Sequence, residues 1–193
     1  MQHHIEDRLQ ITDLMTGWIY RDLGQWDALR QLFHPDGTIE VTWFEGKARD
    51  FIDGSMKMGA SEARTKHLIG TPLVSFNPSA TKAIVETNAV IVGENIKLNV
   101  GCEGHNRFYD RVEKRDGVWK LLHRESIYDM ATFTFPMGPV EIESAVVAKY
   151  PREYAALAYM LEKSGFPVKR VFATRGSELE IKMKTAGLAW LNA

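Results

Sequence analysis

The first third of the chain has the hydrophobic spacing of amphipathic helices. Apolar residues recur at the i, i+3, i+4, i+7, i+8 spacing of one helical face: Ile11, Leu14, Met15, Trp18 and Ile19. Gly24 marks the end of this helix. A second, shorter helix is predicted on the stripe from Trp26 to Phe33, and the Pro-Asp-Gly turn at 35–37 ends it. Residues 38–44 are then typical of a strand, and residues 47–58 of a loose helix.

From residue 67 the pattern becomes that of β-structure. Four stretches rich in β-branched and aromatic residues follow one another at 68–76, 81–92, 96–112 and 118–128. Turn signals lie between them at 77–79, 93–95 and 115–117. Gaps this short indicate consecutive antiparallel strands, because parallel crossovers need a dozen or more residues. Helices followed by a run of strands predict an α+β fold.

The last part of the chain is predicted to be helical again. Residues 132–139 carry Pro and Gly and resemble a linker. Pro151 suits a first helical position, an apolar stripe runs from Tyr154 to Leu161, and Gly165 lies beyond its end. A short extended piece at 168–172 and an amphipathic segment that reaches Trp190 complete the chain.

Composition narrows the function classes. The chain has 193 residues, 45% of them hydrophobic, with a formal net charge of −1 and no run of like charges. We therefore expect neither a nucleic-acid nor a membrane partner. Residues 1–6 lack the apolar core of a signal peptide, and no apolar run reaches the roughly 18 residues of a membrane span. A cytosolic protein is expected.

Cysteine and histidine spacing argues against a metal centre. Cys102 is the single cysteine, so a cysteine-rich zinc site is excluded, and its apolar surroundings predict an inert thiol. The six histidines show no H-x-x-x-H or H-x-H spacing. We expect no metal and no other cofactor.

Two ionisable residues fall on apolar faces. Asp22 continues the stripe that begins at Ile11, where a carboxylate needs a partner, unless the frayed helix end lets it reach solvent. His67 shares an alternation face with Ile69, and it is either a satisfied core residue or a base. If the two met, the carboxylate would fix the imidazole tautomer and stabilise an imidazolium. The sequence alone does not show that they meet.

Three stretches resemble the SnoaL-like family of the nuclear-transport-factor-2-like superfamily. They are residues 22–29 (DLGQWDAL), 66–71 (KHLIGT), and 108–111 (FYDR) with 116–120 (DGVWK). The order and spacing are similar to those of scytalone dehydratase, hexachlorocyclohexane dehydrochlorinase and bile-acid 7α-dehydratase, over about residues 5–130. The resemblance implies a cone, in which a curved antiparallel sheet wraps around helices and an apolar pocket. Residues 1–135 would form this cone, and residues 136–193 a helical extension that caps its mouth or packs on a neighbouring subunit.

The resemblance also implies roles for named residues. Asp22 and His67 match a catalytic pair that performs elimination without a cofactor. Arg124 matches a pocket arginine of two of the branches, although an exposed strand arginine is the alternative. Asn106, on an apolar alternation face, matches a substrate-contacting position, and Trp18 is a candidate pocket wall. The tyrosines with which scytalone dehydratase binds the leaving water have no clear match in this sequence, although Tyr20 and Tyr128 are available.

Three functions remain open at this stage. The first is a lyase acting on a hydrophobic ring compound, with loss of water, formaldehyde or halide. The second is an isomerase or cyclase, which in this fold uses a carboxylate base with oxyanion donors. The third is a non-catalytic ligand-binding module, since fold does not imply function. Relatives form dimers or trimers, so we expect a homodimer or homotrimer.

Overall fold

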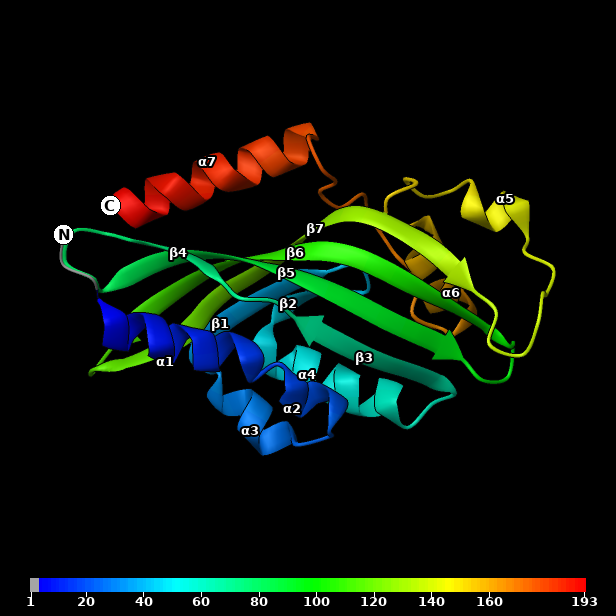
Figure 1. The fold of residues 1–193 in the computed structure, drawn as a ribbon, viewed down its shortest axis with the longest axis horizontal. Helices are drawn as coiled ribbons and strands as arrows, with labels where there is room; N and C mark the ends of the chain where they lie inside the picture. The colour runs from blue at the N-terminus through cyan, green and yellow to red at the C-terminus, as the bar shows by residue number, and fades with distance from the viewer. Residues whose placement is uncertain (1–3) are drawn as a thin grey trace.

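The computed structural model describes residues 4–193 as a curved sheet with helices on both of its faces (Figure 1). Residues 1–3, part of the segment considered above for a signal peptide, lie outside the described residues. The fold is α+β, with helices at the N-terminus, a half-barrel sheet and a helical C-terminus, as the sequence predicts. Within the described chain, no helix is both long and apolar enough to cross a membrane.

The sheet has seven strands in the order β2-β1-β7-β6-β5-β3, with β4 also paired to β5. Their bounds are β1 Phe33–Val41, β2 Phe44–Lys47, β3 Ala63–Ile69, β4 Leu73–Phe76, β5 Lys82–Asn95, β6 Val100–Arg115 and β7 Val118–Thr134. The three long strands β5, β6 and β7 form the expected antiparallel meander. However, β1 pairs with β7 in parallel, so the sheet is mixed. Loop length predicts only the pairing of consecutive strands, and β1 and β7 are far apart in the chain.

The helices are α1 Ile5–Thr16, α2 Ile19–Asp22, α3 Trp26–Gln31, α4 Ala48–Gly59, α5 Ser144–Val147, α6 Ala155–Lys163 and α7 Glu178–Asn192. The single N-terminal helix expected from the stripe is broken after Thr16. The chain passes so close to Leu32 there that a Cβ on Gly17 would lie 2.7 Å from Leu32 Cδ2. The break rotates the following turn. Ile19, predicted to be buried, is therefore 49% exposed, while Arg21 is buried.

Two layers of side chains fill the concave face of the sheet. The N-terminal helices cover one end of this face, around Ile11, Trp18 and Phe51. At the other end, α6 lies against β6 and β7 (Figure 1). Its Leu157 belongs to the same hydrophobic cluster as Tyr128. Both layers leave room between them for a pocket.

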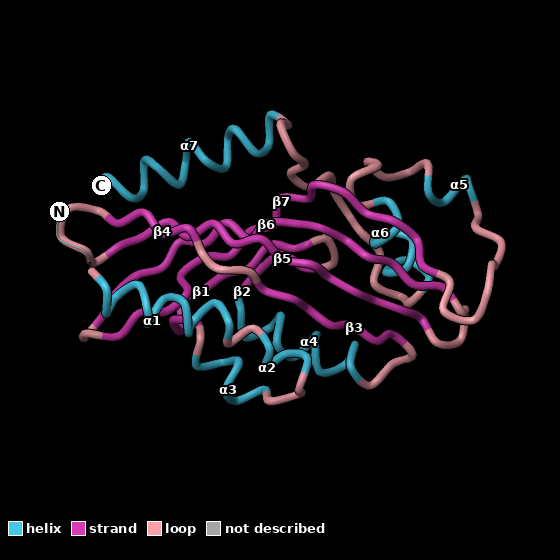
Figure 2. The backbone as a smooth tube through the Cα atoms, in the orientation of Figure 1, coloured by secondary structure: helices cyan, strands magenta, loops and turns pink. Residues whose placement is uncertain are grey.

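The opposite face of the sheet is covered by α7. Figure 2 shows α7 across the strands from the N-terminal helices. Leu191 packs with Ile84 and Tyr109 of this face. Arg107 on β6 also forms ion pairs with Glu86, Asp129 and, on α7, Glu180. Residues 168–172, predicted to be extended, form no strand; the chain joins the sheet by one bridge between Thr174 and Tyr128.

Candidate active site

The structure brings Asp22 and His67 together at the concave face. Asp22 is the last residue of α2, and His67 lies within β3. The His67 Nδ1 and Asp22 Oδ1 atoms are 2.7 Å apart, and the backbone N–H of His67 donates to Asp22 Oδ2 at 2.6 Å. Both side chains are 7% exposed. A carboxylate only accepts hydrogen bonds, so Nδ1 carries the imidazole proton and Nε2 keeps its lone pair.

The surroundings keep the His67 ring neutral. Burial lowers the pKa of His67. The hydrogen bond to Asp22 works in the opposite direction, and the charges of Arg21 and Arg124 lower the pKa further. A neutral imidazole at physiological pH is a competent proton acceptor.

Arg21 adjoins this pair, and the sequence analysis missed it. Its Nη1 donates to Thr65 Oγ1 at 2.7 Å and lies 3.6 Å from Asp22 Oδ1, while Nη2 has, within residues 4–193, only the thioether of Met58 at 3.5 Å as its partner. Burial lowers the pKa of Arg21. A buried guanidinium with one oxygen-bonded N–H has unused donors. Only the helix break could have revealed that Arg21 points inward.

These residues line a pocket with mostly apolar walls. Its cavity volume is about 40 Å³. The lining residues are Trp18, Arg21, Val41, Thr42, Trp43, Phe51, Met58, Thr65, His67, Ile91, Phe108, Ser126, Tyr128, Leu157 and Leu161. A ring-sized ligand would therefore need a wall to move. The α6 residues Leu157 and Leu161 belong to the C-terminal extension, so this extension contributes to the pocket wall of its own chain.

Trp18 and Tyr128 lie in this lining, where the sequence analysis placed them. The Trp18 ring meets His67 edge-on, with centroids 6.0 Å apart. The Tyr128 hydroxyl accepts a hydrogen bond from the Thr42 backbone N–H at 3.0 Å. Burial raises the pKa of Tyr128. Tyr128 thus presents a neutral hydroxyl group beside Thr42 on the pocket wall.

Arg124 is buried behind the pocket wall rather than exposed. It is 1% exposed and forms two 2.8 Å hydrogen bonds to the carboxylate of Asp110. Its guanidinium lies 4.4 Å from the Trp18 ring centroid and 4.1 Å from that of Phe108. The exposed alternative for Arg124 is therefore wrong. Its partner Asp110 was missed, although it shares the inward alternation of Asn106 and Phe108.

Asn106 is the most isolated polar side chain on the concave face. It is 2% exposed, lies opposite Ala89 and Tyr128 in the sheet, and neither atom of its amide group has a hydrogen-bond partner within residues 4–193. Cys102, four residues before Asn106, lies on the same apolar face. Burial raises the pKa of its thiol to about 12, so it is no nucleophile at neutral pH.

Comparisons with known proteins place this geometry in context. The family model described as SnoaL-like domain matches residues 3–125. An uncharacterized protein of Emericella nidulans, AN9274, is 26% identical over 172 residues, covering 81% of this chain and 70% of that protein.

Solved structures share the fold. A hexachlorocyclohexane dehydrochlorinase from Novosphingobium barchaimii superimposes with a TM-score of 0.60 at 20% identity, over 72% of this chain and 97% of that one. A protein described as a candidate scytalone dehydratase, from Novosphingobium aromaticivorans, gives a TM-score of 0.53 at 23% identity, over 68% and 91%. At such identities the likeness establishes a common architecture.

Proposed function

This chain belongs to the SnoaL-like family, and on that premise we propose that it is a lyase that eliminates a small group from a hydrophobic ring compound. The observation that best supports this proposal is that His67, hydrogen-bonded to Asp22, lies in a pocket with mostly apolar walls. Related architectures include dehydrochlorinase and dehydratase structures, which supports elimination chemistry. The aromatic walls favour a ring-containing substrate.

In the proposed reaction, His67 Nε2 takes a proton from a substrate carbon. The C–H electron pair forms the new carbon–carbon double bond, and the neighbouring bond to oxygen or halogen breaks. A departing hydroxide takes the proton that His67 removed from carbon and leaves as water, which restores the neutral imidazole. A halide leaves as the anion, and His67 then gives its proton to solvent. Asp22 stabilises the imidazolium that forms, through the hydrogen bond at Nδ1.

The same geometry disfavours an isomerase with a carboxylate base. Both oxygens of Asp22 accept hydrogen bonds from His67, so its lone pairs are engaged and the imidazole lies between Asp22 and the pocket. A binding module would gain little from burying His67 and Arg21, because desolvating such groups costs free energy. These observations favour a lyase over both alternatives.

The other polar groups receive proposed roles from their positions. Arg21 turns its unused N–H donors toward a substrate oxygen, and the hydroxyl group of Tyr128 contacts a second polar group of the substrate. Asn106 does not line this pocket, so the substrate contact expected for it from the sequence is not assigned to it. Trp18 forms the wall beside His67. Arg124 is a positioning residue, because it lies behind Trp18 and Phe108 and is neutralised by Asp110.

The test compares wild type, His67→Ala and His105→Ala on hydroxylated steroids, aromatic polyketides and halogenated rings, followed by mass spectrometry. His105 is a histidine on the surface, paired with Glu103, and serves as the matched control. Loss of water, formaldehyde or halide from a substrate, absent only with His67→Ala, supports the lyase. A product of unchanged mass with new absorbance would instead indicate an isomerase. Binding without turnover, equal in all three proteins, would remove the catalytic role of His67.

A further inference from the structure

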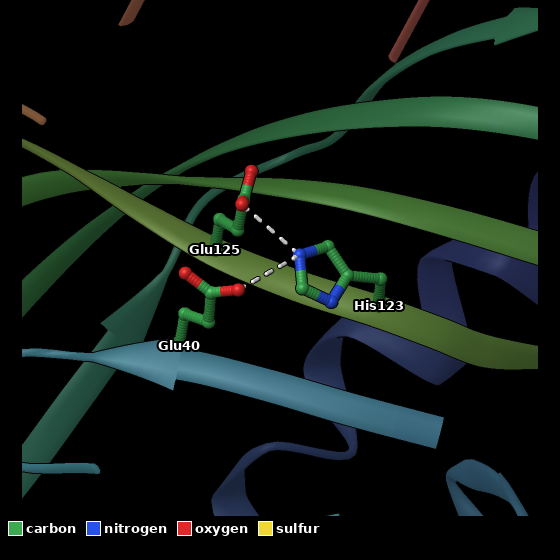
Figure 3. A group of neighbouring side chains, drawn as sticks. All are labelled: Glu40, His123 and Glu125. Atoms are coloured by element: carbon green, nitrogen blue, oxygen red, sulfur yellow. Dashed lines mark ion pairs between the residues drawn. The ribbon is translucent and has the colours of Figure 1, made fainter. Parts of the chain in front are cut away.

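A second group of chemically active side chains lies on the face of the sheet turned away from this pocket. Glu40 on β1 and His123 and Glu125 on β7 each offer a ligand atom, and these atoms lie within 4.8 Å of one another. His123 Nε2 is 3.1 Å from Glu125 Oε1 and 3.9 Å from Glu40 Oε1. Figure 3 shows both carboxylates directed at the same ring nitrogen.

The sheet register fixes this arrangement. In the parallel pair of β1 and β7, Thr38 lies opposite His123, and Glu40 lies opposite Glu125. His123 and Glu125 alternate with Arg124, whose side chain points to the concave face. Two glutamates directly opposite each other repel unless a cation lies between them. The backbone therefore holds two carboxylates and an imidazole together.

The hydrogen bonds leave ligand atoms free. His123 Nδ1 lies 2.6 Å from Thr38 Oγ1, which leaves Nε2 for the carboxylates. Metal-binding histidines characteristically donate their second ring N–H to such a partner. The Oε2 atom of Glu125 is buried and has no hydrogen-bond donor among residues 4–193. Burying a carboxylate oxygen without a hydrogen bond costs free energy, and a bound cation would offset that cost.

We propose that Glu40, His123 and Glu125 bind a divalent transition-metal ion, with Zn²⁺ as its representative. Tetrahedral ligands at zinc bond lengths are roughly 3.3–3.5 Å apart, close to the separations around His123 Nε2. An imidazole with two carboxylates suits such ions, whereas Ca²⁺ and Mg²⁺ prefer all-oxygen sites. A cavity of about 280 Å³ adjoins Glu40 and Glu125 and admits water as a further ligand.

Neighbouring cations limit the affinity of this site. Arg170 binds the other oxygen of Glu40 and also Glu45 Oε2, leaving Glu40 Oε1 free. Arg111 lies opposite His123 on β6, and Lys182 of α7 lines the same cavity. Their positive charge repels a metal ion, so we expect micromolar rather than tighter binding. A bound ion would cross-link β1 to β7 behind the pocket wall.

The test is Zn²⁺ binding to the chain after treatment with a chelator. Isothermal titration calorimetry is expected to give one site per chain, and excess Zn²⁺ to raise the Tm by about 5–11 °C at a hundredfold excess over Kd. His123→Gln and Glu125→Gln are expected to abolish both effects. His105→Gln, which removes a histidine paired with only one carboxylate, is the matched control and keeps them.

Two results would overturn the proposal. One is wild-type protein that binds Zn²⁺ no better than His123→Gln, with circular dichroism showing both folded. The other is binding that survives in His123→Gln and in Glu40→Gln, which would place the ion elsewhere. Absorbance of Co²⁺ in the same site gives a second measure, because its visible spectrum reports the coordination geometry and disappears when a ligand is removed.

Discussion

The buried ion pair between Arg124 and Asp110 makes a strong prediction about stability. Asp110→Asn keeps the size of the side chain and removes its charge. In the wild type, two hydrogen bonds of 2.8 Å join the groups, and the two side chains are 1% and 0% exposed. Burial raises the pKa of Asp110, against the effect of Arg124, so the pair already carries a desolvation cost.

The expected loss follows from this burial. Removing one partner of a buried pair leaves an uncompensated charge and costs about 3–5 kcal/mol. For a chain of this size each kcal/mol lowers the Tm by about 2–4 °C, so the expected fall is about 6–20 °C. Replacing both partners by apolar residues of similar volume, in Asp110→Leu with Arg124→Met, is expected to recover most of the loss.

The assay is thermal and urea unfolding followed by circular dichroism, for wild type, Asp110→Asn and the double variant. Glu113→Gln is the control, since it lies on the same strand in an exposed ion pair with Arg115 and is expected to change stability little. A Tm for Asp110→Asn within about 2 °C of the wild-type value would refute the reasoning, given the cost above. A double variant as unstable as the single one would show that packing, rather than charge, sets the cost.

Three further predictions concern the pocket and α7. Because the folded pKa of His67 is lowered and its neutral form is the base, kcat/KM is expected to stay level as pH drops through about 6.5, the unfolded value, and to fall only at lower pH. Stability is expected to fall already below about 6.5, where the unfolded histidine protonates and the folded one stays neutral; a rate that falls with an unperturbed histidine pKa, or does not change with pH, would contradict this. Arg21→Met removes a positive charge beside the pair, so the acidic limb of the rate profile is expected to move to higher pH; an unmoved limb would exclude Arg21 from the electrostatics. Burial raises the pKa of Glu180, but hydrogen bonds, above all from Arg107, lower it to about 2. The Glu180 carboxylate therefore stabilises the docking of α7 fully above the unfolded pKa of about 4.3, and this stabilisation is lost as pH falls toward 2. Hydrogen exchange of the α7 amides is expected to become faster as pH falls, after correction for the intrinsic rate, and to be faster in Glu180→Gln than in wild type at neutral pH. Equal protection in both proteins would count against a role of Glu180 in docking α7.

The sequence determined the elements that depend on local pattern. The meander of β5, β6 and β7 follows from β-branched runs and turn signals, and the α+β class from the order of helices and strands. Asp22 and His67 could be identified as candidate site residues because each is an ionisable side chain on an otherwise apolar face, where such side chains are rare. The alternation that placed Asn106 inward also applied to Asp110.

The tertiary structure decided everything that depends on distant contacts. The parallel pairing of β1 with β7 created the group around His123, which a search for paired histidines overlooked because its ligands come from two strands. The first helix ends at Thr16, where Gly17 passes close to Leu32, and Arg21 after this break is buried. Whether Arg124 was exposed or buried depended on Asp110 across the strand pair. Hydrophobic periodicity predicts the conformation and the buried face of a single helix or strand. The hydrogen-bond partners, ion pairs and burial of its side chains depend on which other elements pack against it.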